Sequence, residues 1–239
     1  MSGSGQTGGR AGTRAPTRRL TGWSPADLRL WPGRTAAALH VGLAPATEAE
    51  AFDAELAAGT VRSDHWDGLL AYVTINRSWI DGVVVDGPDP TSDPDLTSLL
   101  AALADNGIPA RLVAGGMDPG VLSHAVAEQL VASVSLEVPA VDERLAALVG
   151  VDDAPKRLAA SVEVLVRSGM DHDFHTTADP NVVTIEELPT LAARLRGGRL
   201  YALEPLPRRG ARNHDELVEL RAAARACCAS LPTIVREGR

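Results

Sequence analysis

The sequence predicts a single α/β domain built on a parallel sheet. Short apolar segments rich in Val, Leu and Ala alternate with segments of helical periodicity, and the alternation occurs six times. The chain of 239 residues, 45% of them hydrophobic, can bury one sizeable core, and neither an internal repeat nor an interdomain linker divides it. Strands that are each followed by a helix pair in parallel through right-handed crossovers. The pattern leaves open whether these strands close into a barrel or remain an open sheet.

In the first half of the chain, three apolar runs predict strands at 36–41, 82–85 and 109–114. The second is rich in Val and too short for a helix. Helical patterns occupy 47–58 and 64–79, and a third helix carries four leucines on one face, at Leu96, Leu99, Leu100 and Leu103. Asp93 and Pro94 are suited to begin this helix, and Asn106-Gly107 ends it.

In the second half, strands are expected at 131–138, 171–178 and 199–203. Asp118 is suited to cap the helix before the first of them, and a helix opened by Asp153-Ala154-Pro155 ends at Gly169. The pattern Thr184-x-x-Glu187 is a capping box ahead of a helix that Gly197-Gly198 ends. A last helix is expected over 215–230.

Charge divides the chain into a basic tail and an acidic remainder. Residues 1–19 hold four of the 23 Lys and Arg side chains and none of the 31 acids, and they are rich in Gly, Ser and Thr. This composition predicts a disordered tail over 1–19 and excludes a secretory signal. The domain then covers 20–210, and 211–239 adds a C-terminal helix packed on it. The acidic body argues against a nucleic-acid partner, and no apolar run suits a membrane.

Cysteine usage indicates a reducing compartment. Cys227 and Cys228 are the two cysteines, and adjacent cysteines rarely bond to each other because the geometry is strained. Without a disulfide framework, a cytoplasmic location is expected.

Three segments carry a resemblance to a known family. They are Asp86-Gly87-Pro88-Asp89-Pro90-Thr91 after a run of valines, Trp31-Pro32-Gly33-Arg34-Thr35-Ala36-Ala37 before the first expected strand, and Asp173-Phe174-His175-Thr176-Thr177 on the fifth. From about Trp31 to Pro207 the chain resembles the radical S-adenosylmethionine activases of anaerobic ribonucleotide reductase. The resemblance implies a partial (β/α)6 barrel with a C-terminal helix, and a site at the carboxyl ends of the strands.

The cysteines that bind the iron–sulfur cluster in this family are absent. In the family the first strand ends in Gly-Cys and begins the spacing C-x3-C-x2-C. Carried onto this chain, Gly42 matches the glycine, and the cysteine positions hold Leu43, Thr47 and Glu50. None of these residues supplies the thiolate that holds such a cluster. The sequence therefore predicts a degenerate member with no iron–sulfur cluster and no reductive cleavage, for which S-adenosylmethionine remains a candidate ligand.

The resemblance also implies the residues of the ligand site. The positions expected to bind the cofactor are Asp86, Gly87, Asp89 and Thr177. Asp89 replaces the glutamate of the family turn Gly-Gly-Glu-Pro-Thr, which receives the methionyl amine of the cofactor. The alternative is an ordinary turn aspartate. Pro88 replaces a glycine, which removes a backbone N–H from the turn.

Two further positions complete the candidate catalytic set of Asp89, Glu137 and His175, which can act as acids or bases. Glu137 falls on a strand-end aspartate of the family. His175 replaces an arginine, so carboxylate recognition there is expected to be weaker, because histidine is mostly neutral at pH 7.

A mononuclear metal site is an alternative that the sequence leaves open. Asp171, Asp173 and His175 alternate on one face of the fifth expected strand, His40 is a candidate second histidine, and Glu50 and Glu137 are nearby carboxylates. A solvated strand end with one structural histidine explains the same pattern. No metal ligand is therefore assigned.

Three functions follow from these observations. The first is a cluster-free protein that binds a small molecule or regulates a protein partner. The second is an enzyme that uses the pocket for acid–base chemistry. The third is a metal enzyme. Fold resemblance does not choose among them.

Overall fold

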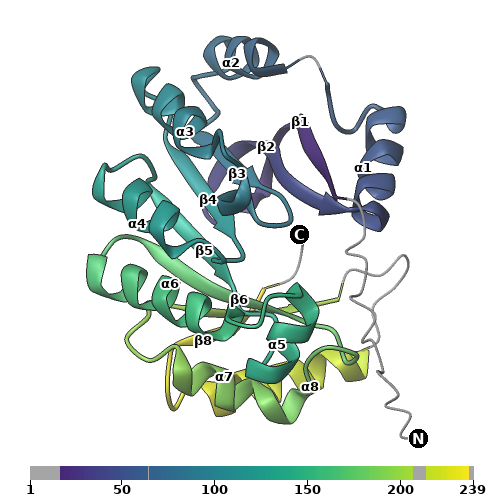
Figure 1. Ribbon diagram of the computed structural model, residues 1–239, viewed down its shortest axis with the longest axis vertical. Coiled ribbons are helices and arrows are strands. Elements are labelled where there is room, and N and C mark those ends of the chain that lie inside the picture. The colour runs from purple at the N-terminus through teal and green to yellow at the C-terminus, as the bar shows by residue number, and fades with distance from the viewer. Residues whose placement is uncertain (1–16, 64, 207–213, 237–239) are drawn as a thin grey trace, which may run out of the picture.

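In a computed structural model, the protein is a curved sheet of eight strands with helices on its convex side (Figure 1). The structure describes residues 17–63, 65–206 and 214–236. The strands are β1 (Thr17–Trp31), β2 (Arg34–Pro45), β3 (Gly82–Asp86), β4 (Ala110–Ala114), β5 (Ser133–Glu137), β6 (His172–Ala178), β7 (Tyr201–Pro205) and β8 (Thr233–Val235).

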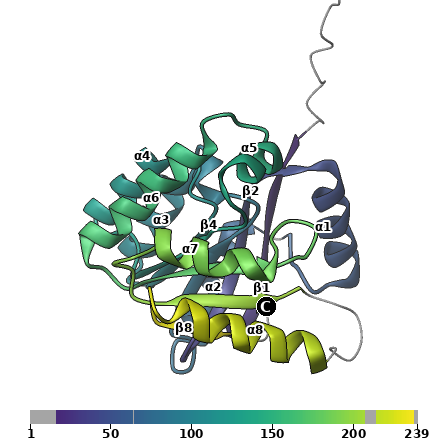
Figure 2. The same cartoon turned by 90° about the horizontal axis from the view of Figure 1, so that it is seen from below.

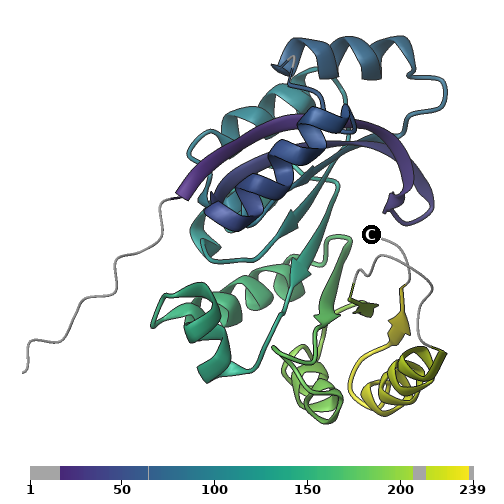
Figure 3. The same ribbon diagram turned by 90° about the vertical axis from the view of Figure 1, so that its right-hand side faces the viewer.

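The strands lie in the sheet in chain order. β1 pairs antiparallel with β2, and every later neighbour pairs in parallel. Within the described residues no pairing joins β8 to β1, so the sheet is open and has two edges. Figure 3 shows β1 and β2 on one side of the curved sheet and β8 on the other. The question that the sequence left open is thus answered: the barrel is partial.

Most of the helices cover the outer face of the sheet (Figures 1 and 2), whereas the first helix packs through Phe52 against His40 on the other face. The helices are α1 (Ala46–Ala58), α2 (His65–Ile75), α3 (Leu96–Asp105), α4 (Pro119–Ala127), α5 (Asp142–Val149), α6 (Ala154–Ser168), α7 (Leu188–Arg194) and α8 (His214–Cys227), with 3-10 turns η1 (Pro90–Ser92) and η2 (Ile185–Glu187). The main core lies between the outer face and the helices, where Val85, Leu112, Leu136, Phe174 and Leu203 are fully buried. No helix among the described residues has both the length and the apolarity to cross a bilayer.

All six expected strands are present, as β2 to β7. Two of the expected caps also form. Asp118 accepts hydrogen bonds from the amides of Gly120 and Val121, and Thr184 and Glu187 form the capping box. Asp93 does not cap α3. Its carboxylate accepts instead from the amides of Asp95 at 2.9 Å and Gly42 at 3.2 Å, which joins the start of α3 to the end of β2.

Three elements were not expected from the sequence: β1, α5 and β8. β1 contains Gly22 and Pro25 and shows no clean alternation, and its strand structure depends on long antiparallel pairing with β2. The expected tail over 1–19 overlaps it, since Thr17 to Arg19 belong to β1, whereas residues 1–16 lie outside the described residues. β8 has three residues and pairs with β7, so the segment after 211 contains a strand as well as a helix.

Candidate functional site

The inner, concave face of the sheet is polar over β5 to β7, whereas an apolar cluster of Trp31, Ala36, Val84 and Val113 lies on β1 to β4. Successive side chains of a strand point to opposite faces, so the residues on either side of an outward-facing core residue point to the inner face. On β4 to β7 the inward residues include Arg111, Ser133, Ser135, Asp173, His175 and Glu204, all buried. Buried polar groups need partners, and these groups provide partners for one another.

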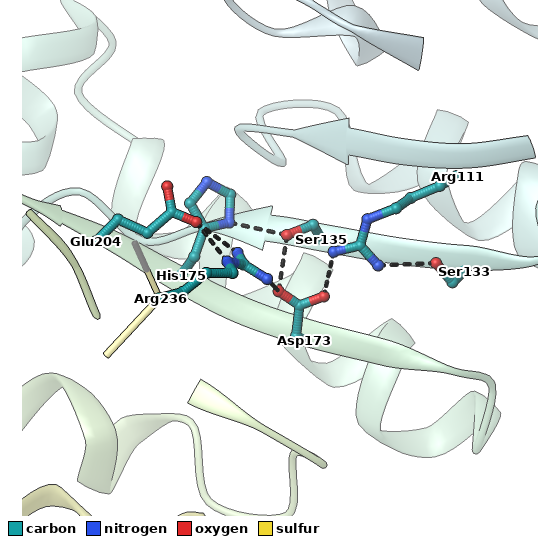
Figure 4. Close-up of polar contacts among 7 residues, drawn as sticks. All are labelled: Arg111, Ser133, Ser135, Asp173, His175, Glu204 and Arg236. Atoms are coloured by element: carbon teal, nitrogen blue, oxygen red, sulfur yellow. Dashed lines mark hydrogen bonds and ion pairs between the residues drawn. The ribbon is translucent and has the colours of Figure 1, made fainter. Parts of the chain in front are cut away.

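Four charged side chains form a buried ion cluster on this face: Arg111, Asp173, Glu204 and Arg236 (Figure 4). Asp173 lies between the two arginines. Nη2 of Arg111 donates to Oδ1 at 2.5 Å, and Nη1 of Arg236 donates to Oδ2 at 2.9 Å. Nε of Arg236 also donates to Oε1 of Glu204 at 2.7 Å. Two cations and two anions thus balance, which makes their burial tolerable.

Electrostatics agree with this arrangement. Burial by itself raises the pKa of the Asp173 carboxyl, but the guanidinium groups of Arg111 and Arg236 outweigh burial and lower the pKa below its ordinary value. Burial likewise lowers the pKa of Arg236, and the carboxylates of Asp173 and Glu204 reverse that effect. Asp173 and Arg236 are therefore ionised at neutral pH.

His175 is connected to the ion cluster through Ser135. The hydroxyl of Ser135 donates to Oδ2 of Asp173 at 2.9 Å, and its oxygen lies 3.0 Å from Nδ1 of His175. Since the hydroxyl proton is used by Asp173, Nδ1 of His175 carries the proton of the second bond. The bond fixes the orientation of the imidazole, and Figure 4 shows its second nitrogen pointing away from Ser135. Glu137 is the register partner of His175 on β5.

Other predicted site residues gather at the mouth, which we define as the carboxyl ends of β2 to β7. The half-buried residues His40, Asp86, Asp89, Glu137 and Thr177 lie there. Register pairs His40 with Asp86 and Thr177 with Glu204. The fold therefore brings the predicted residues to one edge of the sheet, with the ion cluster beneath them.

The loop after β3 fits closely against the end of β2. Gly87 has φ of 150°, and a Cβ there would lie 1.8 Å from the carbonyl oxygen of Val41. Gly42, at the end of β2, has φ of 113° and also faces this loop, since its Cβ would lie 3.3 Å from the carbonyl oxygen of Asp89. Both positions require glycine, and together they fix the loop at the mouth.

Asp89 has a structural task in this loop. Its Oδ1 accepts from the amide of Thr91 at 3.2 Å, the Thr91 hydroxyl at 2.7 Å and the amide of Gly115 at 3.2 Å, and its Oδ2 accepts from the amide of Met117 at 3.1 Å. These bonds join the loop after β3 to the loop after β4. They use most of the acceptor capacity of a carboxylate. The catalytic and ligand-binding roles of Asp89 stay predictions.

The residues at the expected cluster positions do not suit an iron–sulfur cluster. Leu43 lies in β2, and Thr47 and Glu50 lie in α1, where Glu50 is exposed. None offers sulfur, the soft ligand that holds such clusters. In the part of the chain that the structure describes, no group of three His, Cys, Asp or Glu side chains is arranged to hold a metal ion.

The sequence analysis missed Arg111, Ser133, Ser135 and Arg236. Arg111 offered a signal, because it is the single charged residue in the apolar run 109–114. A charge in a buried strand needs a partner. Arg236 offered none, since it follows a strand that was not expected.

No family model and no curated protein matches the sequence. Solved structures do match. The crystal structure of Streptococcus suis SuiB bound to S-adenosylmethionine has a TM-score of 0.55 at 12% identity, over 71% of this chain and 42% of that chain. A second SuiB crystal structure gives 0.52 at 11% identity, over 66% and 40%. The structure of TYW1 with a lysine–pyruvate adduct gives 0.48 at 14%, over 68% and 58%.

The SuiB comparisons confirm the fold. The open, mostly parallel sheet is an α/β partial barrel of the radical S-adenosylmethionine type. At 12% identity the likeness concerns the fold alone, and this chain spans less than half the length of the SuiB chain it matches.

Proposed function

We propose that the protein binds a small cationic molecule at the mouth of the partial barrel and does not cleave S-adenosylmethionine reductively. The observation that carries the proposal is a contrast in charge. Asp86 and Glu137 are half-buried carboxylates at the mouth, whereas the cations and anions of the ion cluster below them balance. Because the ion cluster has no net charge, the carboxylates at the mouth determine the local electrostatic potential, which is negative. A cation is the ligand that such a site favours.

S-adenosylmethionine is the first ligand to test. It carries a sulfonium and an ammonium group, and the similar SuiB structure contains it. Reductive cleavage needs an electron from a cluster, and Leu43, Thr47 and Glu50 give no support for one. The proposal extends to a cytoplasmic protein, on the evidence of its two unpaired cysteines. Regulation of a protein partner would be a consequence of ligand binding.

A titration of thermal stability with S-adenosylmethionine tests the proposal, because a ligand that binds only the folded state raises the melting temperature. S-adenosylhomocysteine, which lacks the sulfonium charge, should bind more weakly. Glu137→Gln should reduce the shift, whereas Glu128→Gln, at an exposed helix end, should not. If the protein gives no shift with either ligand, or a larger shift with S-adenosylhomocysteine, the proposed cation site is wrong.

Iron and sulfide analysis after anaerobic reconstitution tests the second half of the proposal. We expect no stoichiometric cluster and no formation of 5′-deoxyadenosine with a strong reductant. A reconstituted protein with stoichiometric iron and sulfide would contradict it.

A second candidate is an enzyme that uses His175 as an acid or base beside Glu137. The hydrogen bond that Nδ1 of His175 donates to Ser135 favours it, because it fixes the tautomer and the ring direction. This chemistry does not need S-adenosylmethionine. A mutation of His175 would then abolish turnover while ligand binding remains.

A further inference from the structure

Ser24, His40 and Asp86 lie side by side on three adjacent strands. Ser24 is the register partner of Ala38 on β2, and His40 follows two residues later, so both point to the inner face. The distance from Ser24 Oγ to His40 Nε2 is 2.8 Å. Asp86 is the register partner of His40 on β3 and therefore shares this face.

The order of these groups is the order of a nucleophile, a base and an orienting carboxylate. The carboxylate of Asp86 interacts with the imidazole of His40 through its charge, and the tautomer with its proton on Nδ1 leaves Nε2 able to accept. Nε2 then accepts a hydrogen bond from the hydroxyl of Ser24. In acyl-transfer enzymes the same nitrogen accepts the proton of the nucleophilic serine.

Neighbouring groups determine whether His40 can accept a proton. Burial lowers its pKa, while the carboxylates of Asp86 on β3 and Glu55 on α1 act in the opposite direction; the net pKa lies below the ordinary value. His40 is therefore neutral at pH 7 and able to act as a base.

The imidazole is held in place by packing. The ring of Phe52 on α1 contacts it edge-on, with centroids 5.9 Å apart. Gly22, the register partner of His40, leaves space for this helix, because a Cβ at Gly22 would lie 2.6 Å from Val61 and 3.0 Å from Phe52. A base that is fixed in direction loses less entropy when it acts.

We propose that Ser24 is a nucleophile for acyl transfer, with His40 as its general base and Asp86 as the orienting carboxylate. Ser24 Oγ attacks the carbonyl carbon of an ester, its proton passes to Nε2 of His40, and the leaving alkoxide takes that proton as the ester bond breaks. Water then attacks the acyl-serine through the same base. The products are a carboxylic acid and an alcohol. This site shares Asp86 with the ligand site proposed above, but its reaction does not require that ligand.

The surroundings indicate the class of substrate. Phe52, Ala49 and Val61 form a small apolar cluster beside His40, and Asp86 and Glu55 make the site negative. Small neutral or cationic esters suit it better than anionic ones.

A fluorophosphonate probe tests the site directly. An activated serine attacks phosphorus, the O–P bond forms and fluoride leaves. We expect one adduct per chain, located on Ser24 by peptide mass spectrometry, and hydrolysis of p-nitrophenyl acetate with a burst of p-nitrophenolate. Ser24→Ala should lose both. The matched control Ser78→Ala, at an exposed position outside the site, should retain both.

Variants of the base separate activation from simple exposure of Ser24. His40→Gln should slow labelling by about 100-fold, and Asp86→Asn by at least about tenfold. Folding of each variant is checked by circular dichroism. If His40→Gln does not fold, the labelling rate of the unmodified protein against pH replaces it. That rate should level off once His40 is deprotonated, whereas a steady rise to pH 10 belongs to an unactivated serine. Absence of a Ser24 adduct, or an unchanged rate in folded His40→Gln, would overturn the proposal.

Discussion

Nη1 of Arg236 lies 2.9 Å from Oδ2 of Asp173, although 63 residues separate them in the chain. This contact fastens β8, a strand of three residues, to the centre of the sheet. At the two ends of β8, the backbone adds bonds from the amide of Arg236 to the carbonyl of Leu203 at 2.9 Å and from the amide of Tyr201 to the carbonyl of Pro232 at 2.8 Å. An edge strand this short has few ladder bonds, so the buried ion pairs carry much of its attachment.

Removing Arg236 should destabilise the protein strongly. In Arg236→Met the apolar stem is kept, but Asp173 and Glu204 lose the cation they share. Breaking a buried ion pair from one side costs about 3–5 kcal/mol. Urea denaturation measures the loss. The free energy of unfolding of Arg236→Lys should lie between those of the unmodified protein and Arg236→Met, because lysine keeps the charge and lacks the planar guanidinium group.

Arg167→Met is the matched control. Its ion pair with Glu163 on α6 is exposed, with 79% and 57% of the two side chains accessible, so the free energy of unfolding should change little. Equal losses in the two variants would show that burial of the Arg236 pair adds nothing.

The stability of the protein should depend on Asp173 in acid. The folded protein lowers the pKa of this carboxyl from 3.8, so the unfolded chain binds more protons as the pH falls through this range. The stabilisation is fully present above about pH 4 and is lost at lower pH.

Urea denaturation midpoints measured between pH 2 and pH 6 test this predicted contribution of Asp173 to stability. The difference between the unmodified protein and Asp173→Asn should shrink as the pH falls below about 4. A constant difference across the range would mean that ionisation of Asp173 does not contribute.

Asp89 should matter for stability whether or not a ligand is present. In Asp89→Asn one acceptor oxygen is replaced by a donor, so either Met117 or the Thr91 and Gly115 amides lose their partner. A buried donor left without a partner costs about 1–3 kcal/mol. Hydrogen exchange should show faster exchange at the Gly115 and Met117 amides. Asp152→Asn, at an exposed position, is the control. If Asp89→Asn is as stable as this control, Asp89 does not hold the two loops together.

Sequence reasoning succeeded where a short range of residues decides the structure. The valines of β3 and the leucines of α3 indicate their own conformation and burial. β1 could not be predicted in this way, because its pairing with β2 determines it. His175 was predicted as a site residue from a motif, whereas its partner Ser135 lies 40 positions away on another strand. The partners of Arg111 and Arg236 depend on the register of the sheet, which local patterns do not contain.

The close fit of the loop after β3 gives a last prediction. Gly87 and Gly33 both have positive φ, 150° and 77°, but they differ in the space around them. A Cβ at Gly33 meets nothing within 4 Å, so Gly33→Ala should cost only the conformational strain of about 1–2 kcal/mol. A Cβ at Gly87 would lie 1.8 Å from the carbonyl oxygen of Val41, and backbone cannot yield as a flexible side chain does. Gly87→Ala must therefore separate the loop from β2, which displaces Asp86 and Asp89 from the mouth.

Urea denaturation should show a clearly larger loss of stability for Gly87→Ala than for Gly33→Ala. The Ser24 probe reaction should slow in Gly87→Ala alone, because Asp86 shifts away from His40. Equal losses of stability in the two alanine variants would show that the loop after β3 does not rest against β2.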